Sequence, residues 1–207
     1  MRDVYRTEDG RAAVRHWCRS TLSSWPAPHE RSEIVTSVGR THLVRAGVGS
    51  VTVLFLPGTN LNASTSLDFL ARLAEQHRVV GADVPGQPGL SEGSLAGEHV
   101  RAAHRLWVNE VIRSLHAEWM TLVARHTRPR VAPAPLTPEE LSRWKHTHRV
   151  ALSGERDCFL PVSKLGAAVR SQLAMDLEVI PGAGHLTSIE DPQRLTDAIA
   201  TLVWPTT

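Results

Sequence analysis

The 207-residue chain has the length of one domain with a sizeable hydrophobic core. Its formal net charge is +2 without a long run of one sign, so neither nucleic acid nor a membrane surface is expected as a partner. Cys18 and Cys158 stand far apart without ligand spacing, which excludes a disulfide framework and gives no metal site. A charged start and the lack of a long apolar run predict a cytoplasmic protein, and no cofactor is expected.

Hydrophobic periodicity and Gly/Pro punctuation predict alternating helices and strands. In chain order they are a helix over 10–22, a hairpin over 32–38 and 41–46 turning at 39–40, a strand over 51–56, a helix over 64–76, a strand over 78–82, a helical segment over 98–126, a helix over 137–145, a strand over 148–153, a helix over 163–173, a strand over 177–180 and a helix over 191–203. Strands that alternate with helices predict an α/β fold with a mostly parallel sheet.

The central strand is predicted at 51–56, an unbroken apolar run that ends at Pro57-Gly58. Ligands of such sheets collect where the strands end, so Gly58, Thr59 and Asn60 are candidate binding residues. Gly58 allows backbone conformations that other residues rarely adopt, and such a conformation could turn the amide of Thr59 toward a bound oxygen. The simpler alternative is a strand-to-helix turn, with Asn62 or Ser64 capping the next helix.

Four segments together resemble the α/β-hydrolase superfamily. They are residues 54–60, residues 83–91, residues 152–157 and residues 181–185, which resemble the loops after the third, fourth, seventh and eighth strands of that family. The sequence departs from the family by having Pro57-Gly58 in place of a histidine-glycine pair, and by one extra residue in the loop after Asp83.

The resemblance implies that Asp157 is the triad acid, His185 the general base and the Thr59 amide an oxyanion donor. A carboxylate bonded to one imidazole nitrogen fixes the tautomer and stabilises the imidazolium that forms when the other nitrogen takes a proton. Alternatively, Asp157 is an ordinary turn aspartate, and His185 caps a helix or lies in the core.

The family's nucleophile elbow, G-x-S-x-G between the fifth strand and a helix, is not found where it is expected. A literal match occurs at residues 89–93, but Pro85 to Gly89 are not a strand and no apolar helix follows directly. Ser91 is nevertheless retained as a nucleophile candidate, and Ser64 and Cys158 are further candidates.

The simplest account is an internal deletion, with a join near residue 116, that removes the fifth and sixth strands and much of the cap. The expected organisation is one shortened α/β-hydrolase-like domain over 1–207, with a helical segment and remnant cap over 98–146. The strand at 51 would then have an unpaired edge unless the strand at 150 pairs with it, which predicts marginal stability and a surface where two copies of the chain can pair as a homodimer.

Two functions follow from this interpretation. The first is hydrolysis of small ester, lactone or amide substrates by a Ser-His-Asp type of mechanism, with weak activity or none because the nucleophile is not recognised. The second is a non-catalytic module that binds a small molecule or a protein, in which Trp107, Trp119 and Trp144 line a pocket, join a partner surface or pack the long helices.

Overall fold

The structure is a computed structural model that describes residues 4–92, 100–115, 120–124 and 150–203. The chain divides into two compact units, residues 1–132 and residues 133–207, which are described separately. Within the described residues no helix is long and apolar enough to span a membrane. The sequence-based expectation of one domain over 1–207 stays a prediction.

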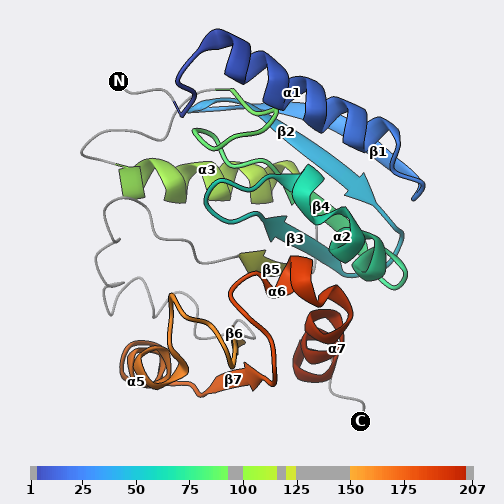
Figure 1. Cartoon of the computed structure of the whole chain (residues 1–207). Coiled ribbons are helices and arrows are strands. Elements are labelled where there is room, and N and C mark those ends of the chain that lie inside the picture. Colours follow the sequence, from blue (N-terminus) through green and yellow to red (C-terminus); the bar gives the residue numbers. More distant parts are fainter. Residues whose placement is uncertain (1–3, 93–99, 116–119, 125–149, 204–207) are drawn as a thin grey trace. The chain divides into compact units, whose positions relative to one another are not determined.

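The first unit contains a five-stranded mixed sheet in the order β1-β2-β4-β3-β5 (Figure 1). β1 (His29–Thr36) pairs antiparallel with β2 (Gly39–Ala46), and β2 pairs antiparallel with β4 (Arg78–Ala82). β3 (Thr52–Leu56) runs parallel to β4 on one side and to β5 (Met120–Ala124) on the other. The hairpin turn lies at Ser37 and Val38, two residues before its predicted position, because Thr36 pairs with Gly39.

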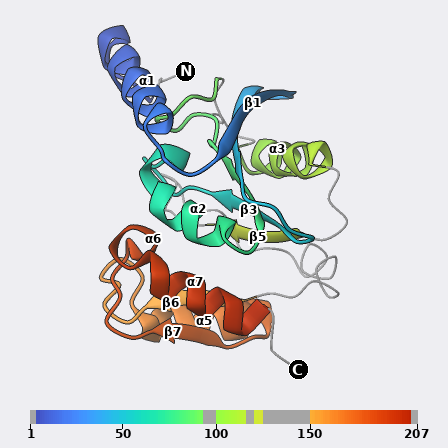
Figure 2. The same ribbon diagram turned by 90° about the vertical axis from the view of Figure 1, so that its right-hand side faces the viewer.

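Helices lie on both faces of this sheet (Figure 2). They are α1 (Glu8–Ser23), the 3-10 turn η1 (Ala63–Ser66), α2 (Leu67–Ala74) and α3 (Val100–Ser114), of which α1 and α2 lie on one side of the strands and α3 on the other. The predicted helices at 10–22 and 64–76 and the strands at 51–56 and 78–82 are confirmed. Thr7 caps α1, since its hydroxyl oxygen accepts the Gly10 amide at 3.1 Å.

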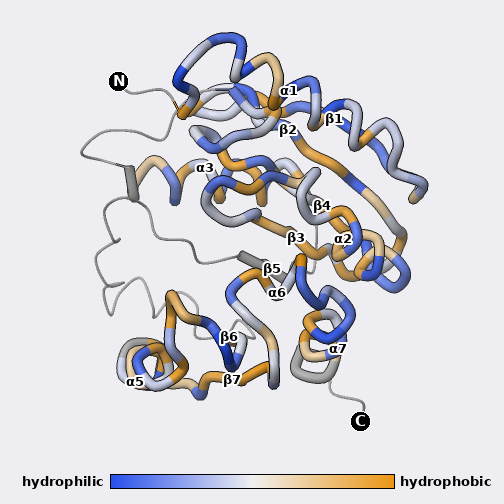
Figure 3. The backbone as a smooth tube through the Cα atoms, in the orientation of Figure 1, coloured by the Kyte–Doolittle hydropathy of each residue, from blue (hydrophilic) through white to orange (hydrophobic). Residues whose placement is uncertain are grey.

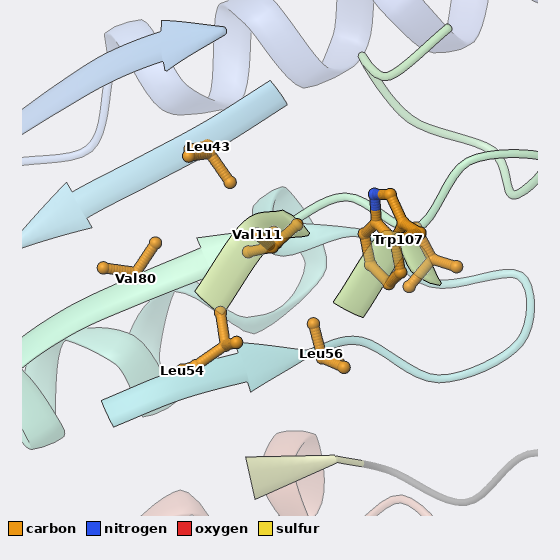
Figure 4. Close-up of a cluster of buried hydrophobic side chains, with 8 residues drawn as sticks. Leu43, Leu54, Leu56, Val80, Trp107 and Val111 are labelled. Atoms are coloured by element: carbon orange, nitrogen blue, oxygen red, sulfur yellow. The ribbon is translucent and has the colours of Figure 1, made fainter. Parts of the chain in front are cut away.

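β3 is buried at every position, as expected for a central strand. Its apolar residues are coloured as hydrophobic in Figure 3. Successive side chains of a strand point to opposite faces. Leu54 and Leu56 therefore pack in a cluster with Trp107 and Val111 of α3 (Figure 4), while the ring of Phe55 packs on Phe69 of α2 at 5.4 Å between centroids.

Trp107 is a core residue. Its side chain is 1% exposed, and its indole N–H donates to the hydroxyl of Thr41 at 2.8 Å, so the buried polar atom is paired. Of the uses considered for this tryptophan, helix packing is the one observed. Trp119 and Trp144 lie outside the described residues.

β5 corrects the expectation for the segment after α3. The helix was predicted to continue to residue 126, and the fifth strand was expected to be missing. Instead α3 ends at Ser114, and residues 120–124 form a strand whose Cα partners run from Thr52–Met120 to Leu56–Ala124. The edge of β3 is therefore paired, and the argument for marginal stability from an open edge at this strand is wrong. The strand near residue 150 pairs elsewhere.

The second unit contains a two-stranded parallel sheet of β6 (Ala151–Gly154) and β7 (Leu177–Ile180), with α5 (Val162–Leu173) between them in sequence. α6 (Thr187–Glu190) and α7 (Pro192–Val203) follow β7. Its buried apolar side chains among the described residues are Ile180, Ile199, Ala183 and Val169. The predicted order of strand, helix, strand and helix is confirmed, whereas the helix expected at 137–145 and the rest of the remnant cap lie outside the described residues.

Candidate active site

Asp157 and His185 meet in the second unit, where each follows one of two adjacent parallel strands. Asp157 lies in the loop after β6, and His185 lies in the loop after β7. The imidazole Nδ1 lies 2.8 Å from Oδ2 of the carboxylate, which is the distance of a charge-assisted hydrogen bond. Because carboxyl ends of parallel strands share one edge of a sheet, residues 28 positions apart become neighbours.

The carboxylate of Asp157 is held on both oxygens. Oδ1 accepts the backbone amides of Phe159 at 2.9 Å and Leu160 at 2.8 Å, while Oδ2 faces His185. Burial raises the pKa of Asp157, but the hydrogen bonds from His185, Leu160 and Phe159 outweigh burial, and the net effect lowers the pKa below its ordinary value. The group is therefore an anion at neutral pH, as the orienting acid of a histidine must be.

Backbone contacts bind the acid loop to the histidine loop. The amide of Glu155 donates to the carbonyl of Ile180 at 3.0 Å, and the amide of Arg156 donates to the carbonyl of Ala183 at 2.8 Å. A Cβ at Gly154 would lie only 2.3 Å from the carbonyl oxygen of Gly184. This close approach requires glycine, and it brings the side chains of Asp157 and His185 within hydrogen-bond distance.

The histidine loop is also held by the helix that follows it. The amide of Gly184 donates to Oε2 of Glu190 at 3.0 Å, and the hydroxyl of Thr187 donates to the carbonyl of Gly184 at 2.8 Å. The His185 side chain is 25% exposed, so it is not a core histidine, and the N-cap position of α6 is occupied by Leu186. Neither structural alternative for His185 describes its position, whereas a general base needs this partial access to solvent.

The predicted oxyanion loop follows β3 in the first unit. The Leu61 amide donates to the Gly58 carbonyl at 3.0 Å, which closes a four-residue turn. The positive φ of this turn is at Asn60 (61°), so the conformational freedom that glycine offers at position 58 is not used for a positive φ. Asparagine tolerates this left-handed conformation because its short polar side chain can form hydrogen bonds with nearby main-chain groups. The Asn60 amide donates to Oε1 of Gln87 at 2.8 Å. The role of the Thr59 amide as an oxyanion donor stays a prediction.

The alternative interpretation of this loop was a strand-to-helix turn in which Asn62 or Ser64 caps the following helix. Asn62 is the N-cap of η1, and the Asn62 amide donates to the hydroxyl of Thr65 at 3.3 Å. A capped strand-to-helix turn and a loop that presents an amide to a ligand are compatible. Ser64, the other capping candidate and a candidate nucleophile, is buried, and its hydroxyl donates to the carbonyl of Cys18 at 3.4 Å.

Ser91 has backbone partners in the first unit. Its hydroxyl donates to the carbonyl of Asp83 at 2.7 Å and accepts the amide of His42 at 2.9 Å. The side chains of those two residues are also near each other, with His42 Nδ1 3.4 Å from Asp83 Oδ2, and both are buried. Serine, histidine and aspartate thus meet here, but the hydroxyl of Ser91 is bonded to main-chain atoms of the other two residues. This arrangement connects the loop after β4 to β2.

β5 occupies the position beside β3 from which the family's nucleophile elbow would continue. The residues that follow it in sequence are Arg125, His126 and Thr127, which do not form a G-x-S-x-G motif and lie outside the described residues. The sequence analysis missed this strand. The signal was Thr121-Leu122-Val123, a short apolar and β-branched run that was assigned to the preceding helix.

The remaining candidate groups are the cysteines and metal-binding clusters. Cys158 is free and exposed, whereas Cys18 is buried, and burial raises the pKa of the Cys18 thiol further than Ser64 and Arg15 lower it. Among the described residues, no group of three His, Cys, Asp or Glu side chains is placed to bind a metal ion.

The fold of the chain is similar to those of several solved structures. Carboxylesterase CesB from Bacillus subtilis superposes with a TM-score of 0.76 at 16% identity, over 97% of this chain and 100% of that chain. The naproxen esterase from Bacillus subtilis gives 0.75 at 16% identity, over 96% and 99%. The N-acyl homoserine lactonase AidH gives 0.59 at 13% identity, over 84% and 97%.

Comparisons by sequence give a different result: no protein-family model matches the chain, and no curated protein matches it. At identities of 13% to 16%, the structural likeness establishes the fold. The chain has an α/β-hydrolase fold, with a mixed sheet flanked by helices.

Proposed function

We propose that the protein is a hydrolase of small ester, lactone or amide substrates in which His185 is the general base and Asp157 its orienting acid. The observation that carries this proposal is the 2.8 Å hydrogen bond between His185 and the charged Asp157. The partial exposure of the imidazole agrees with a role in proton transfer. Activity is expected to be weak, because no nucleophile elbow is recognised in the sequence.

In the proposed reaction the Nδ1–H of His185 keeps its hydrogen bond to Asp157, and Nε2 takes a proton from the attacking oxygen, which makes the ring an imidazolium. The negative carboxylate stabilises the imidazolium that forms, and the imidazolium then returns the proton to the leaving group. The attacking oxygen belongs to a side-chain hydroxyl or to water. The proposed role of the Thr59 amide as an oxyanion donor rests only on the resemblance of residues 54–60 to the family's loop after the third strand.

The structural neighbours support this substrate class. CesB and the naproxen esterase are esterases, and AidH is a lactonase, so the same fold acts on small acyl compounds in those proteins. Fold alone does not define a substrate. We therefore propose only that the ligand is a small acyl compound and that the protein works in the cytoplasm without nucleic acid or membrane partners.

The test is turnover of 4-nitrophenyl butyrate together with labelling by a fluorophosphonate probe. His185→Ala is compared with wild type and with His16→Ala, which removes an exposed histidine of α1. The control is needed because any exposed imidazole hydrolyses activated esters slowly. We expect His185→Ala to lose turnover and His16→Ala to keep it, because of these two histidines only His185 is paired with a buried carboxylate. Mass spectrometry of the probe adduct would identify the nucleophile. Equal turnover in all three proteins would reject His185 as the base.

A second candidate function is a non-catalytic module that binds a small molecule or a protein. It is favoured by the sequence after β5, where Arg125-His126-Thr127 replaces the nucleophile elbow. For this candidate we expect a folded protein that gives neither turnover nor a probe adduct, and that still binds short acyl compounds in a calorimetric or ligand-observed NMR titration.

The expected homodimer needs an unpaired sheet edge. The edge of the strand at 51, from which the homodimer was expected, is paired with β5, so pairing would need an edge strand of this sheet such as β1. Glu30, Arg31 and Glu33 of this strand are exposed and charged, and charged edge strands resist pairing with another chain. The proposal therefore needs direct measurement of the molar mass, for which sedimentation equilibrium at several concentrations is suitable. A single mass of one chain throughout would reject it.

A further inference from the structure

We propose that Phe159 is a positioning residue for the candidate active site, holding the imidazole of His185 with its ring and the carboxylate of Asp157 with its backbone amide. The proposal rests on the proposed function, because it assigns Phe159 a part in that reaction. It concerns only residues of the second unit.

The ring of Phe159 contacts the imidazole directly. The two ring centroids are 4.9 Å apart, and the ring planes are inclined by 56°, which is within the range of aromatic pairs that attract one another. The phenyl side chain is 59% exposed, so most of its surface is not used in the hydrophobic core. Its described aromatic contact is the general base, which gives this exposed ring a role that core packing does not.

The backbone of Phe159 contacts the other member of the pair. Its amide donates to Oδ1 of Asp157 at 2.9 Å, while Oδ2 of the same carboxylate lies 2.8 Å from His185 Nδ1. The amide contact fixes the direction in which the phenyl side chain leaves the main chain. One residue thus touches both Asp157 and His185, and its two contacts set the carboxylate and the imidazole relative to each other.

The ring contact adds a second restraint to that of the hydrogen bond. The hydrogen bond acts on the imidazole through Nδ1 alone, whereas the phenyl contact acts on the ring as a whole, and both oppose rotation about the broad sp³–sp² side-chain torsion. Contact with the phenyl ring limits that rotation. The phenyl ring also attracts the imidazolium formed during proton transfer, since a cation within about 6 Å of an aromatic centroid is stabilised by its quadrupole.

The test compares Phe159→Ala, Phe159→Leu and Phe159→Tyr. Ala removes the ring, Leu keeps an apolar side chain, and Tyr keeps the ring with its hydroxyl able to reach solvent. Ile189→Ala is the matched control, because Ile189 is also an exposed apolar residue of the same unit, 43% exposed on α6. Both readouts are independent of turnover: the rate at which diethyl pyrocarbonate modifies His185, followed by mass spectrometry, and the low-field NMR signal of its Nδ1 proton, assigned by its loss in His185→Ala.

We expect Phe159→Ala and Phe159→Leu to increase the modification rate about two- to tenfold, the range that the interaction energy of one aromatic pair allows. The Nδ1 signal should broaden in both variants, while Phe159→Tyr and Ile189→Ala should match wild type. Because Ala, Leu and Tyr share the backbone amide, a structural effect of the loop alone would not separate Tyr from Leu.

Two results would overturn the inference: Phe159→Ala indistinguishable from wild type in both readouts, or Phe159→Tyr as altered as Phe159→Leu. The inference and the proposed function fail separately. A wild-type protein without turnover whose His185 signals depend on an aromatic residue at position 159 would reject the hydrolase proposal and keep the positioning contact. Turnover that depends on His185, without any effect at position 159, would do the reverse.

Discussion

His185 Nδ1 lies 2.8 Å from Asp157 Oδ2, although 28 residues separate the two in sequence. The contact is formed by two adjacent parallel strands, β6 and β7, whose following loops are joined by main-chain hydrogen bonds. The pair is therefore built within residues 150–203, and its geometry depends on how closely those two loops approach.

Asp157→Asn should reduce any His185-dependent turnover by about 10³- to 10⁴-fold, as loss of the triad carboxylate does in serine hydrolases. The amide is neutral, so it does not stabilise the imidazolium, although it keeps an oxygen that accepts the Phe159 and Leu160 amides. Steady-state kinetics measure the effect, and Asp176→Asn is the control, because Asp176 is an exposed partner of Arg170. A fall of less than about tenfold in a folded variant would contradict the role of the charge.

The pH dependence of stability should also report on Asp157. Its pKa is lower in the folded protein than its ordinary value, because hydrogen bonds from His185, Leu160 and Phe159 outweigh the opposing effect of burial. A lowered folded-state pKa contributes stability that is present above the unfolded pKa, about 3.9 for aspartate, and is lost as the pH falls through the folded value.

Urea unfolding of wild type and Asp157→Asn between about pH 6 and about pH 3 measures this contribution. We expect the difference in unfolding free energy to be largest at the upper end and to shrink on acidification, since the variant has no carboxyl to protonate there. A difference that is constant over the whole range would show that Asp157 does not titrate with a lowered pKa in the folded state.

Gly154→Ala should destabilise the protein and separate Asp157 from His185. The added Cβ would meet main-chain atoms, the carbonyl oxygens of Gly184 at 2.3 Å and Ala183 at 2.4 Å, which are not free to move without opening the two loops. We expect a loss of about 1–3 kcal/mol in unfolding free energy, typical of overpacking, together with loss of the low-field His185 signal.

The control for that substitution is Gly166→Ala in α5. A Cβ at Gly166 would only meet Leu177 at 3.9 Å, an ordinary contact, and alanine is favoured over glycine inside a helix by about 0.5–1 kcal/mol. We therefore expect Gly166→Ala to be neutral or stabilising. If the two substitutions change the thermal unfolding temperature equally, the close approach of the two loops at Gly154 is not the reason that glycine is needed there.

Much of the fold follows from the sequence because its signals are local. The buried run at 52–56, the stop at Pro57-Gly58 and the alternation of strands and helices in 151–203 predict elements that the structure confirms within a few residues. The Asp157–His185 pair was implied by four short segments taken together, and the structure brings these two side chains into contact.

The parts that the sequence did not predict depend on contacts between distant residues. The segment from Met120 to Ala124 is too short for its hydrophobic pattern to distinguish a strand from a helix. It forms a strand because it pairs with β3. The positive φ is at Asn60 rather than at Gly58. The Asn60 amide donates to the side chain of Gln87, which is 27 residues away in sequence, so the conformation of this turn depends on a distant residue. Neither partner is visible in local sequence.

Ser91→Ala decides between a nucleophile and a structural serine at the G-x-S-x-G match. Since the Ser91 hydroxyl joins the amide of His42 to the carbonyl of Asp83, we expect the variant to lose about 1–3 kcal/mol of unfolding free energy and to keep the turnover of wild type. Ser24→Ala is the control, because the Ser24 hydroxyl is exposed and donates only locally, to the carbonyl of Thr21. Turnover and probe labelling abolished in Ser91→Ala, with stability equal to the Ser24 control, would instead identify Ser91 as the nucleophile.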